Sequence, residues 1–180
     1  RGIYRTTNGG ATWEQVLFVN DSASGIDLVQ HPTNPDILYA AMWERMRGLN
    51  YRRSFGPSSG IWLTVNGGDT WTKLQGGLPQ GNQVGRIGLA ISPSDPERLY
   101  AFFDNNTGEA VYRTLNGGQN WTRTNDNAIQ GMNSSFGWYF GQIRVNPVNP
   151  DVIYLLGVDL YYSTNGGNSY TQLADRKSVV

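Results

Sequence analysis

The sequence predicts an all-β protein built from repeated four-stranded units, and three observations support this. The first is composition: the 180 residues include 23 Gly, 6 Trp and 10 Tyr, while only 16% are charged. Such a composition favours short strands joined by tight turns over helices. The other two observations are short motifs that recur along the chain, one rich in glycine and one rich in proline.

The glycine-rich motif occurs in four gap-free copies, and its shared asparagine recurs about every 50 residues, at Asn8, Asn66, Asn116 and Asn165. The copies are residues 2–13 (GIYRTTNGGATW), 60–71 (GIWLTVNGGDTW), 110–121 (AVYRTLNGGQNW) and 159–170 (DLYYSTNGGNSY). Asn-Gly-Gly supplies the positive φ values of a tight hairpin. Each copy therefore predicts two strands joined by a turn, and we expect its closing Trp or Tyr to pack over that hairpin.

The proline-rich motif precedes the last three copies, as HPTNPDILYAA, SPSDPERLYAF and NPVNPDVIYLL. Proline fixes φ, and Asn or Asp bonds its own downstream backbone, so the motif predicts a turn between two strands. His31 occupies the position taken by Ser92 and Asn146 in the other copies. We therefore interpret this single histidine as a turn residue and not as a metal ligand or general base.

Together the motifs divide each unit into four strands, most clearly at residues 87–91, 99–103, 111–114 and 121–124. Four strands in about 50 residues are typical of a β-propeller blade. The sequence thus predicts a β-propeller of four-stranded antiparallel blades, with about three and a half blades present. The predicted division is a half blade at 1–19, blades at 26–75, 86–125 and 140–174, and a tail at 175–180.

Three and a half blades cannot close a ring, because propellers have about four to eight blades and an open sheet edge invites aggregation. We therefore expect the chain to be a fragment, whose partners include the remaining blades of a longer parent chain.

Charge and residue usage argue against several function classes. Lys and Arg balance Asp and Glu at 14 each, so no basic surface indicates nucleic acid. The chain has no Cys and one His, which argues against a metal site, and we expect no cofactor. No apolar run approaches the ~20 residues that span a membrane.

The glycine-rich motif, Ser/Thr-x-Asn-Gly-Gly-x-Thr/Asn/Ser-Trp/Tyr, resembles the Asp-box or BNR repeat, with Asn where the commonest form has Asp. Combined with the proline turn, it is more similar to the sortilin/VPS10-like and xyloglucanase-like (glycosyl hydrolase BNR repeat) groups than to the sialidases. The resemblance covers nearly the whole chain. It implies a secreted or periplasmic propeller.

Blade geometry limits the search for functional carboxylates. The Asp-box and proline turns share one face, and propeller ligands generally lie on the other face, around the central channel. Asp27, near the start of a first strand, is the best-placed carboxylate there, and Glu44 is the second. Both are candidates for glycoside hydrolysis, which needs two carboxyl groups across the scissile bond. No motif assigns either a catalytic role.

The longest connection, residues 43–60 (WERMRGLNYRRSFGPSSG), is the leading binding candidate, because long loops on rigid scaffolds concentrate binding residues. Its rings can stack on sugars or peptide side chains, and its arginines offer paired donors. The alternative is a loop that packs on a neighbouring blade. A second aromatic segment, SSFGWYFGQ from residue 134, should bury either Tyr139 or Phe140. The predicted ligand-binding residues are Trp43, Arg45, Arg47, Tyr51, Arg52 and Trp138.

Two function classes follow, with a third left open. The first is a secreted propeller that binds, and in its enzymatic form hydrolyses, a glycan. The second is a non-catalytic sortilin-like module that binds a peptide or protein. A structural or assembly role is the third, because one propeller scaffold hosts all of these functions.

Overall fold

The protein folds as a series of antiparallel sheets, seen in a computed structural model that describes residues 1–174. A two-stranded sheet comes first, formed by β1 (Ile3–Arg5) and β2 (Glu14–Leu17). The second sheet holds β3 (Ala23–Gln30), β4 (Leu38–Glu44), β7 (Gly60–Thr64) and β8 (Thr72–Lys73). The third holds β9 (Arg86–Ile91), β10 (Leu99–Asn105), β11 (Gly108–Thr114) and β12 (Thr122–Arg123). The fourth holds β13 (Gln142–Val145), β14 (Ile153–Leu156), β15 (Leu160–Ser163) and β16 (Thr171–Ala174).

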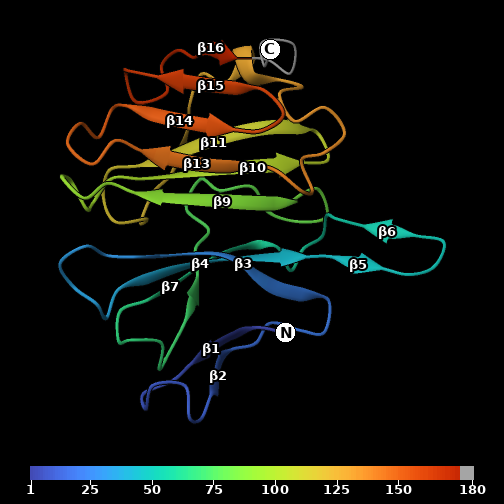
Figure 1. Ribbon diagram of the computed structural model, residues 1–180, viewed down its shortest axis with the longest axis vertical. Coiled ribbons are helices and arrows are strands. Elements are labelled where there is room, and N and C mark those ends of the chain that lie inside the picture. The colour runs from blue at the N-terminus through green and yellow to red at the C-terminus, as the bar shows by residue number, and fades with distance from the viewer. Residues whose placement is uncertain (175–180) are drawn as a thin grey trace.

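The sheets meet through their first strands. β9 lies next to both β3 and β13 and is seen between them in Figure 1. The apolar core fills the space between successive sheets, so the second strands of the second and third sheets, β4 and β10, are covered on both faces. Residues 39–44 of β4 and 99–103 of β10 are accordingly all buried.

This arrangement confirms the all-β class and the four-stranded antiparallel blade of a β-propeller. The fourth strand of the third sheet is shorter than expected, since β12 covers only Thr122–Arg123 of the predicted 121–124. The sheets span residues 3–17, 23–73, 86–123 and 142–174. The division at 1–19, 26–75, 86–125 and 140–174 stays a prediction, and the tail at 175–180 lies outside the described residues.

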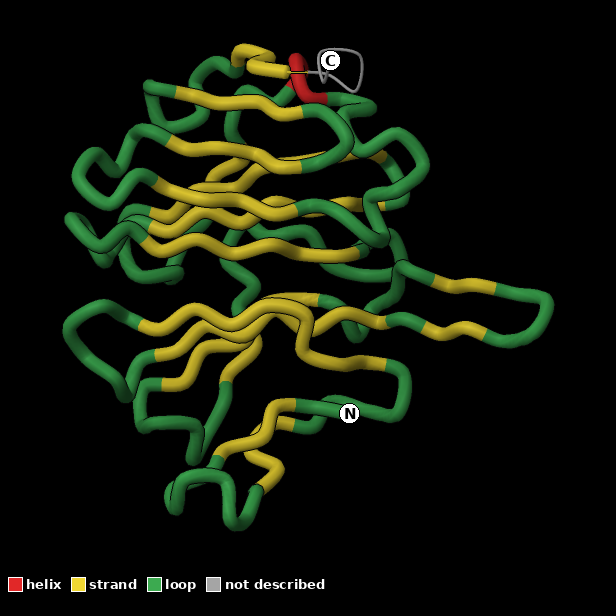
Figure 2. Tube along the Cα trace, viewed as in Figure 1, coloured by secondary structure: helices red, strands yellow, loops and turns green. Residues whose placement is uncertain are grey.

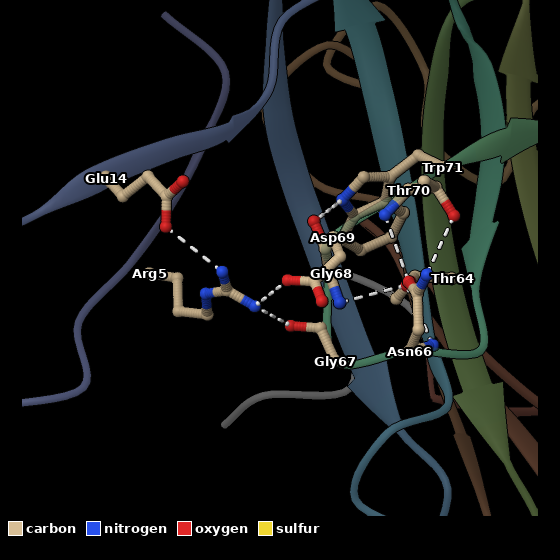
Figure 3. A network of polar contacts seen from close by, with 9 residues as sticks. All are labelled: Arg5, Glu14, Thr64, Asn66, Gly67, Gly68, Asp69, Thr70 and Trp71. Atoms are coloured by element: carbon tan, nitrogen blue, oxygen red, sulfur yellow. Dashed lines mark hydrogen bonds and ion pairs between the residues drawn. The ribbon is translucent and has the colours of Figure 1, made fainter.

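Each Asp-box forms a hairpin whose turn is closed by side chains (Figure 3). The Thr64 hydroxyl donates to Asn66 Oδ1 at 2.9 Å and accepts from the Gly68 amide at 2.9 Å. Asn66 Oδ1 also accepts from the Thr70 amide at 3.0 Å. The same bonds recur in the other three copies, at Thr6/Asn8, Thr114/Asn116 and Ser163/Asn165.

The closing aromatic packs on its own hairpin, as expected. The indole nitrogens of Trp71 and Trp121 donate to the carbonyls of Gly68 and Gly118, each at 3.1 Å. Both glycines of every Asn-Gly-Gly have positive φ, such as 66° and 100° at Gly67 and Gly68. The role assigned to the glycines is therefore confirmed.

Successive blades are linked by a long side chain that donates to the first Asp-box glycine carbonyl of the next blade. Arg5 reaches Gly67 O at 2.9 Å and also binds Asp69 and Glu14 (Figure 3). The links at the next two junctions are Tyr39 to Gly117 O and Arg113 to Gly166 O, both at 2.9 Å. The Asp-box therefore joins blades as well as forming a hairpin.

The proline motifs form turns that are closed by their first residue. His31 Nδ1 accepts from the Asn34 amide at 3.1 Å, while Asn146 Oδ1 accepts from the Asn149 amide at 3.0 Å. Ser92 Oγ does the same for Asp95 at 3.2 Å. The interpretation of His31 as a turn residue is confirmed.

These turns and the Asp-boxes lie along one edge of the molecule, at the left of Figure 1. The β4–β7 connection lies along the opposite edge. Among residues 1–174, no helix is long and apolar enough to cross a membrane.

Candidate functional site

The connection between β4 and β7 projects from the sheets as a hairpin, which we call the arm, residues 45–53 (Figures 1 and 2). Its strands are β5 (Met46–Arg47) and β6 (Arg52–Arg53). The turn is closed by the Gly48 amide, which donates to Tyr51 O at 3.0 Å, and the Tyr51 ring lies over Gly48. Because Leu49 and Tyr51 are both exposed, the arm presents its tip to solvent instead of packing on a blade.

The base of the arm is held by the last two residues of β4. Trp43 is buried, and its indole nitrogen donates to Ser54 O at 2.8 Å. Glu44 is also buried; it pairs with Arg53 at 2.6 Å and accepts from the Ser58 amide at 3.0 Å. Trp43 and Glu44 therefore both hold the base of the loop in place.

Arginine and tryptophan side chains from three segments meet beside the arm. The Arg45 guanidinium lies 5.0 Å from the ring centre of Trp43 and 5.1 Å from that of Trp138. Arg52 lies 4.6 Å from the Trp138 centre. Such spacings are those of cation–π contacts. With Arg47, which lines the adjoining hollows, these residues form what we call the arginine–indole surface: Trp43, Arg45, Arg47, Arg52 and Trp138.

Trp138 belongs to the connection between β12 and β13, which includes the short 3₁₀ helix η1 (Asn127–Ile129). Ile129 and Met132 anchor this segment in the core, and the Trp138 indole donates to Ser135 O at 3.0 Å. The expectation that Tyr139 or Phe140 is buried was wrong, because they are 63% and 38% exposed. β13 begins only at Gln142, so neither residue takes part in its alternation.

A polar pocket of about 710 Å³ adjoins this surface and shares Arg52 and Trp138 with it. Its walls come from the β6 end of the arm, the β10–β11 turn and the segment after η1. Most of the lining residues have polar side chains, and Phe55 and Trp138 contribute two aromatic rings. The polar side chains are Arg52, Arg53, Ser54, Asp104, Asn105, Asn106, Glu109, Gln130, Ser134 and Ser135.

Two carboxyl groups stand side by side in the polar pocket. Asp104 and Glu109 are directly opposed across the β10–β11 hairpin, so their side chains share one face. Both Glu109 oxygens accept backbone amides, from Gly131 at 2.9 Å and Asn133 at 3.1 Å. Burial raises the pKa of Asp104 to about 6, and the charge of Glu109 adds to the rise. Asp104 therefore takes up a proton near neutral pH more readily than an ordinary aspartate.

Asp27 lies in the middle of β3, where a bulge between Gly25 and Asp27 shifts the pairing with β4. Its Oδ2 accepts a hydrogen bond from the Leu89 amide of β9 at 2.9 Å, and its Oδ1 accepts one from the amide of the next residue, Leu28, at 2.9 Å. Asp27 thus joins two blades at their inner strands. The structure does not bring it together with Glu44, which anchors the arm.

Asp104 and Glu109 are the carboxyl groups that sequence reasoning did not single out. The β10–β11 turn that separates them lies away from the Asp-box turns, and neither residue belongs to a recurring motif. The available signal is the two-residue turn, Asn106 and Thr107, which sets them opposite each other. Among the described residues, no group of three or more His, Cys, Asp or Glu could hold a metal ion.

Three solved structures similar to this chain are propeller proteins. A GH74 enzyme from Niastella koreensis has a TM-score of 0.64 and 23% identity, over 98% of this chain and 27% of that one. A GH74 xyloglucanase from Xanthomonas campestris has a TM-score of 0.66 and 15% identity, over 92% and 24%. YCF48 from Cyanidioschyzon merolae has a TM-score of 0.56 and 18% identity, over 91% and 41%. The chain therefore spans only about a quarter of the two GH74 proteins.

These likenesses support the propeller fold. No curated protein matches the sequence. A family model does match it: the Sortilin-Vps10 model, described as sortilin, neurotensin receptor 3, covers residues 1–142. This agrees with the Asp-box resemblance drawn from the repeats, and the chain belongs to the Sortilin-Vps10 family.

Proposed function

We propose that this protein binds a glycan in the polar pocket. The observation that carries the proposal is the lining itself, a hollow of about 710 Å³ whose walls combine amide, hydroxyl and carboxyl side chains with two aromatic rings. Sugar hydroxyls both donate and accept hydrogen bonds, so they need such a mixed lining, while apolar ring faces match aromatic side chains. A location outside the cytoplasm stays a prediction from the family resemblance.

Binding is better supported than hydrolysis. Glycoside hydrolysis generally needs two carboxyl groups that face the scissile bond. Asp104 is partly exposed in the pocket, with a pKa raised to about 6, as suits a general acid. Glu109 is buried and its two oxygens are engaged by backbone amides, so it holds the loop instead of facing a ligand. Asp27 accepts a hydrogen bond from the Leu89 amide, and Glu44 forms an ion pair with Arg53, so both carboxylates already have partners within the protein.

A peptide- or protein-binding function is the second candidate, and the projecting arm favours it. The arm exposes Leu49 and Tyr51 at its tip, and a protein partner can cover such a hairpin. The polar pocket favours the glycan over the peptide, because its hydroxyl, amide and carboxyl side chains match the many hydroxyl groups of a sugar.

The proposal is tested by a substitution that fills the pocket with a large side chain. Ser135→Trp places a large ring in the lining, and Val148→Trp places the same ring on an exposed proline turn at the opposite edge. Binding of the full chain to a panel of neutral and acidic polysaccharides is measured by affinity electrophoresis and calorimetry. We expect Ser135→Trp to lose binding about tenfold or more, and Val148→Trp to bind as the parent does. Equal binding by both variants, or no binding to any polysaccharide, would contradict the proposal.

A further inference from the structure

The arginines of the arm differ in whether they are neutralised. Arg53 is paired with Glu44. Arg45, Arg47 and Arg52 take part in none of the ion pairs formed among residues 1–174. Three positive charges therefore lie together within eight residues of chain, on a protein whose net charge is zero. Charge of one sign gathered at one site indicates a ligand of the opposite sign.

The indole rings hold two of these arginines in place. Trp43 and Trp138 are each fixed by a hydrogen bond from the indole nitrogen, and Arg45 lies within 5.1 Å of both ring centres. Arg52 lies 4.6 Å from the centre of the Trp138 ring. A guanidinium that stacks by its face keeps its N–H groups, which lie in its plane, for an acceptor at its edge. A held guanidinium also loses less entropy when it binds a carboxylate.

Among the described residues, no acidic side chain lines the hollows beside these arginines. One, of about 370 Å³, is lined by Arg45, Arg47, residues 48–51, Arg52 and Trp138. The other, of about 480 Å³, also contains Arg45 and Arg47, together with Arg1 and Trp43. The acidic groups lie instead in the polar pocket on the far side of Arg52 and Trp138. Charge is thus separated along one continuous surface, basic at the arm and mixed polar in the pocket.

We propose that the arginine–indole surface binds the carboxylates of an acidic polysaccharide, whose neutral sugar hydroxyls occupy the polar pocket. This inference rests on the proposed glycan-binding function and names the class of glycan. A uronate chain carries hydroxyls and one carboxylate on each sugar, so it matches both parts of the surface. A run of acidic peptide side chains is matched less well, because it offers no hydroxyl groups to the polar side chains of the pocket.

The experiment compares two polymers with the same sugar backbone: polygalacturonate, whose carboxylates are charged, and its fully methyl-esterified form, whose ester groups are neutral. The full chain should bind polygalacturonate at least tenfold more tightly, and added salt should weaken that binding as it screens exposed charges. Arg47→Gln removes an exposed guanidinium that contacts neither indole, and Arg52→Gln removes one that does. Each should weaken binding of polygalacturonate about tenfold, as loss of a charge-assisted hydrogen bond does.

Arg144→Gln is the matched control, since Arg144 is an exposed arginine on β13 outside these hollows. It should bind polygalacturonate within about twofold of the parent. Equal binding of the two polymers would overturn this inference and leave the glycan-binding function standing. Loss of binding to every polysaccharide would overturn both. Binding of poly-L-glutamate as tight as that of polygalacturonate would overturn the inference in favour of an acidic peptide.

Discussion

The Thr64 hydroxyl closes a buried Asp-box turn, and its removal by Thr64→Val should measurably destabilise the protein. Thr64 is 1% exposed, and the hydroxyl accepts from the buried Gly68 amide at 2.9 Å while donating to Asn66 at 2.9 Å. Valine has nearly the same shape, so the substitution leaves the Gly68 amide buried without a partner. Such an orphaned donor costs about 1–3 kcal/mol, and the lost bond to Asn66 adds about 1 kcal/mol.

We therefore expect Thr64→Val to lower the free energy of unfolding by about 2–4 kcal/mol, and Tm by about 4–16 °C for a chain of this length. The assay is urea and thermal unfolding followed by tryptophan fluorescence. Thr6→Val is the matched control, because Thr6 makes the same bonds, to Asn8 and Gly10, in a half blade where water reaches them. It should cost less than about 1 kcal/mol, since water replaces exposed hydrogen bonds. Equal costs in the two variants would refute the reasoning.

Three further predictions follow from the carboxyl groups. Folding raises the pKa of Asp104 from 3.8 to about 6, so between these pH values the folded chain holds a proton that the unfolded chain has lost. The free energy of unfolding should therefore fall as pH rises from about 4 to 6. Asp104→Asn should flatten that fall, as measured by thermal unfolding at several pH values. A slope unchanged in Asp104→Asn would contradict this. Asp27→Ala strands the buried Leu89 amide and should cost about 1–3 kcal/mol in urea unfolding, against a smaller cost for Asp27→Asn, which keeps an acceptor. Equal costs would show that the bond contributes little. Glu44→Ala releases Arg53 and should speed tryptic cleavage of the arm several-fold in limited proteolysis, whereas a rate like that of the parent would mean that Glu44 does not anchor it.

The repeats were predictable because their chemistry is local. Thr64, Asn66 and the glycines between Asn66 and Asp69 bond one another within a few residues, so the motif carries its own structure. The same holds for His31 and its proline turn. Four copies in register then indicate a blade architecture, and the structure confirms it.

The site was only partly predictable. The loop that forms the arm was predictable as the leading binding candidate, because the connection from Trp43 to Gly60 breaks the repeat pattern, and its binding role stays a prediction. The exposure of Tyr139 and Phe140 was not, since it depends on where β13 begins, which the pairing with β14 decides. The contact of Trp138 with Arg45 joins residues about 90 positions apart. No local pattern carries that information.

Local sequence is enough to predict the all-β class, the four-stranded repeat and the place where the repeat is interrupted, because each depends on turn chemistry within a few residues. Which charged groups are neutralised depends instead on how the blades pack. Their packing pairs Glu44 with Arg53, directs Asp27 to the Leu89 amide, and leaves Arg45 against two indole rings. The physical reason is that charge pairing and burial depend on which segments of distant sequence the packed blades bring within a few ångströms of one another.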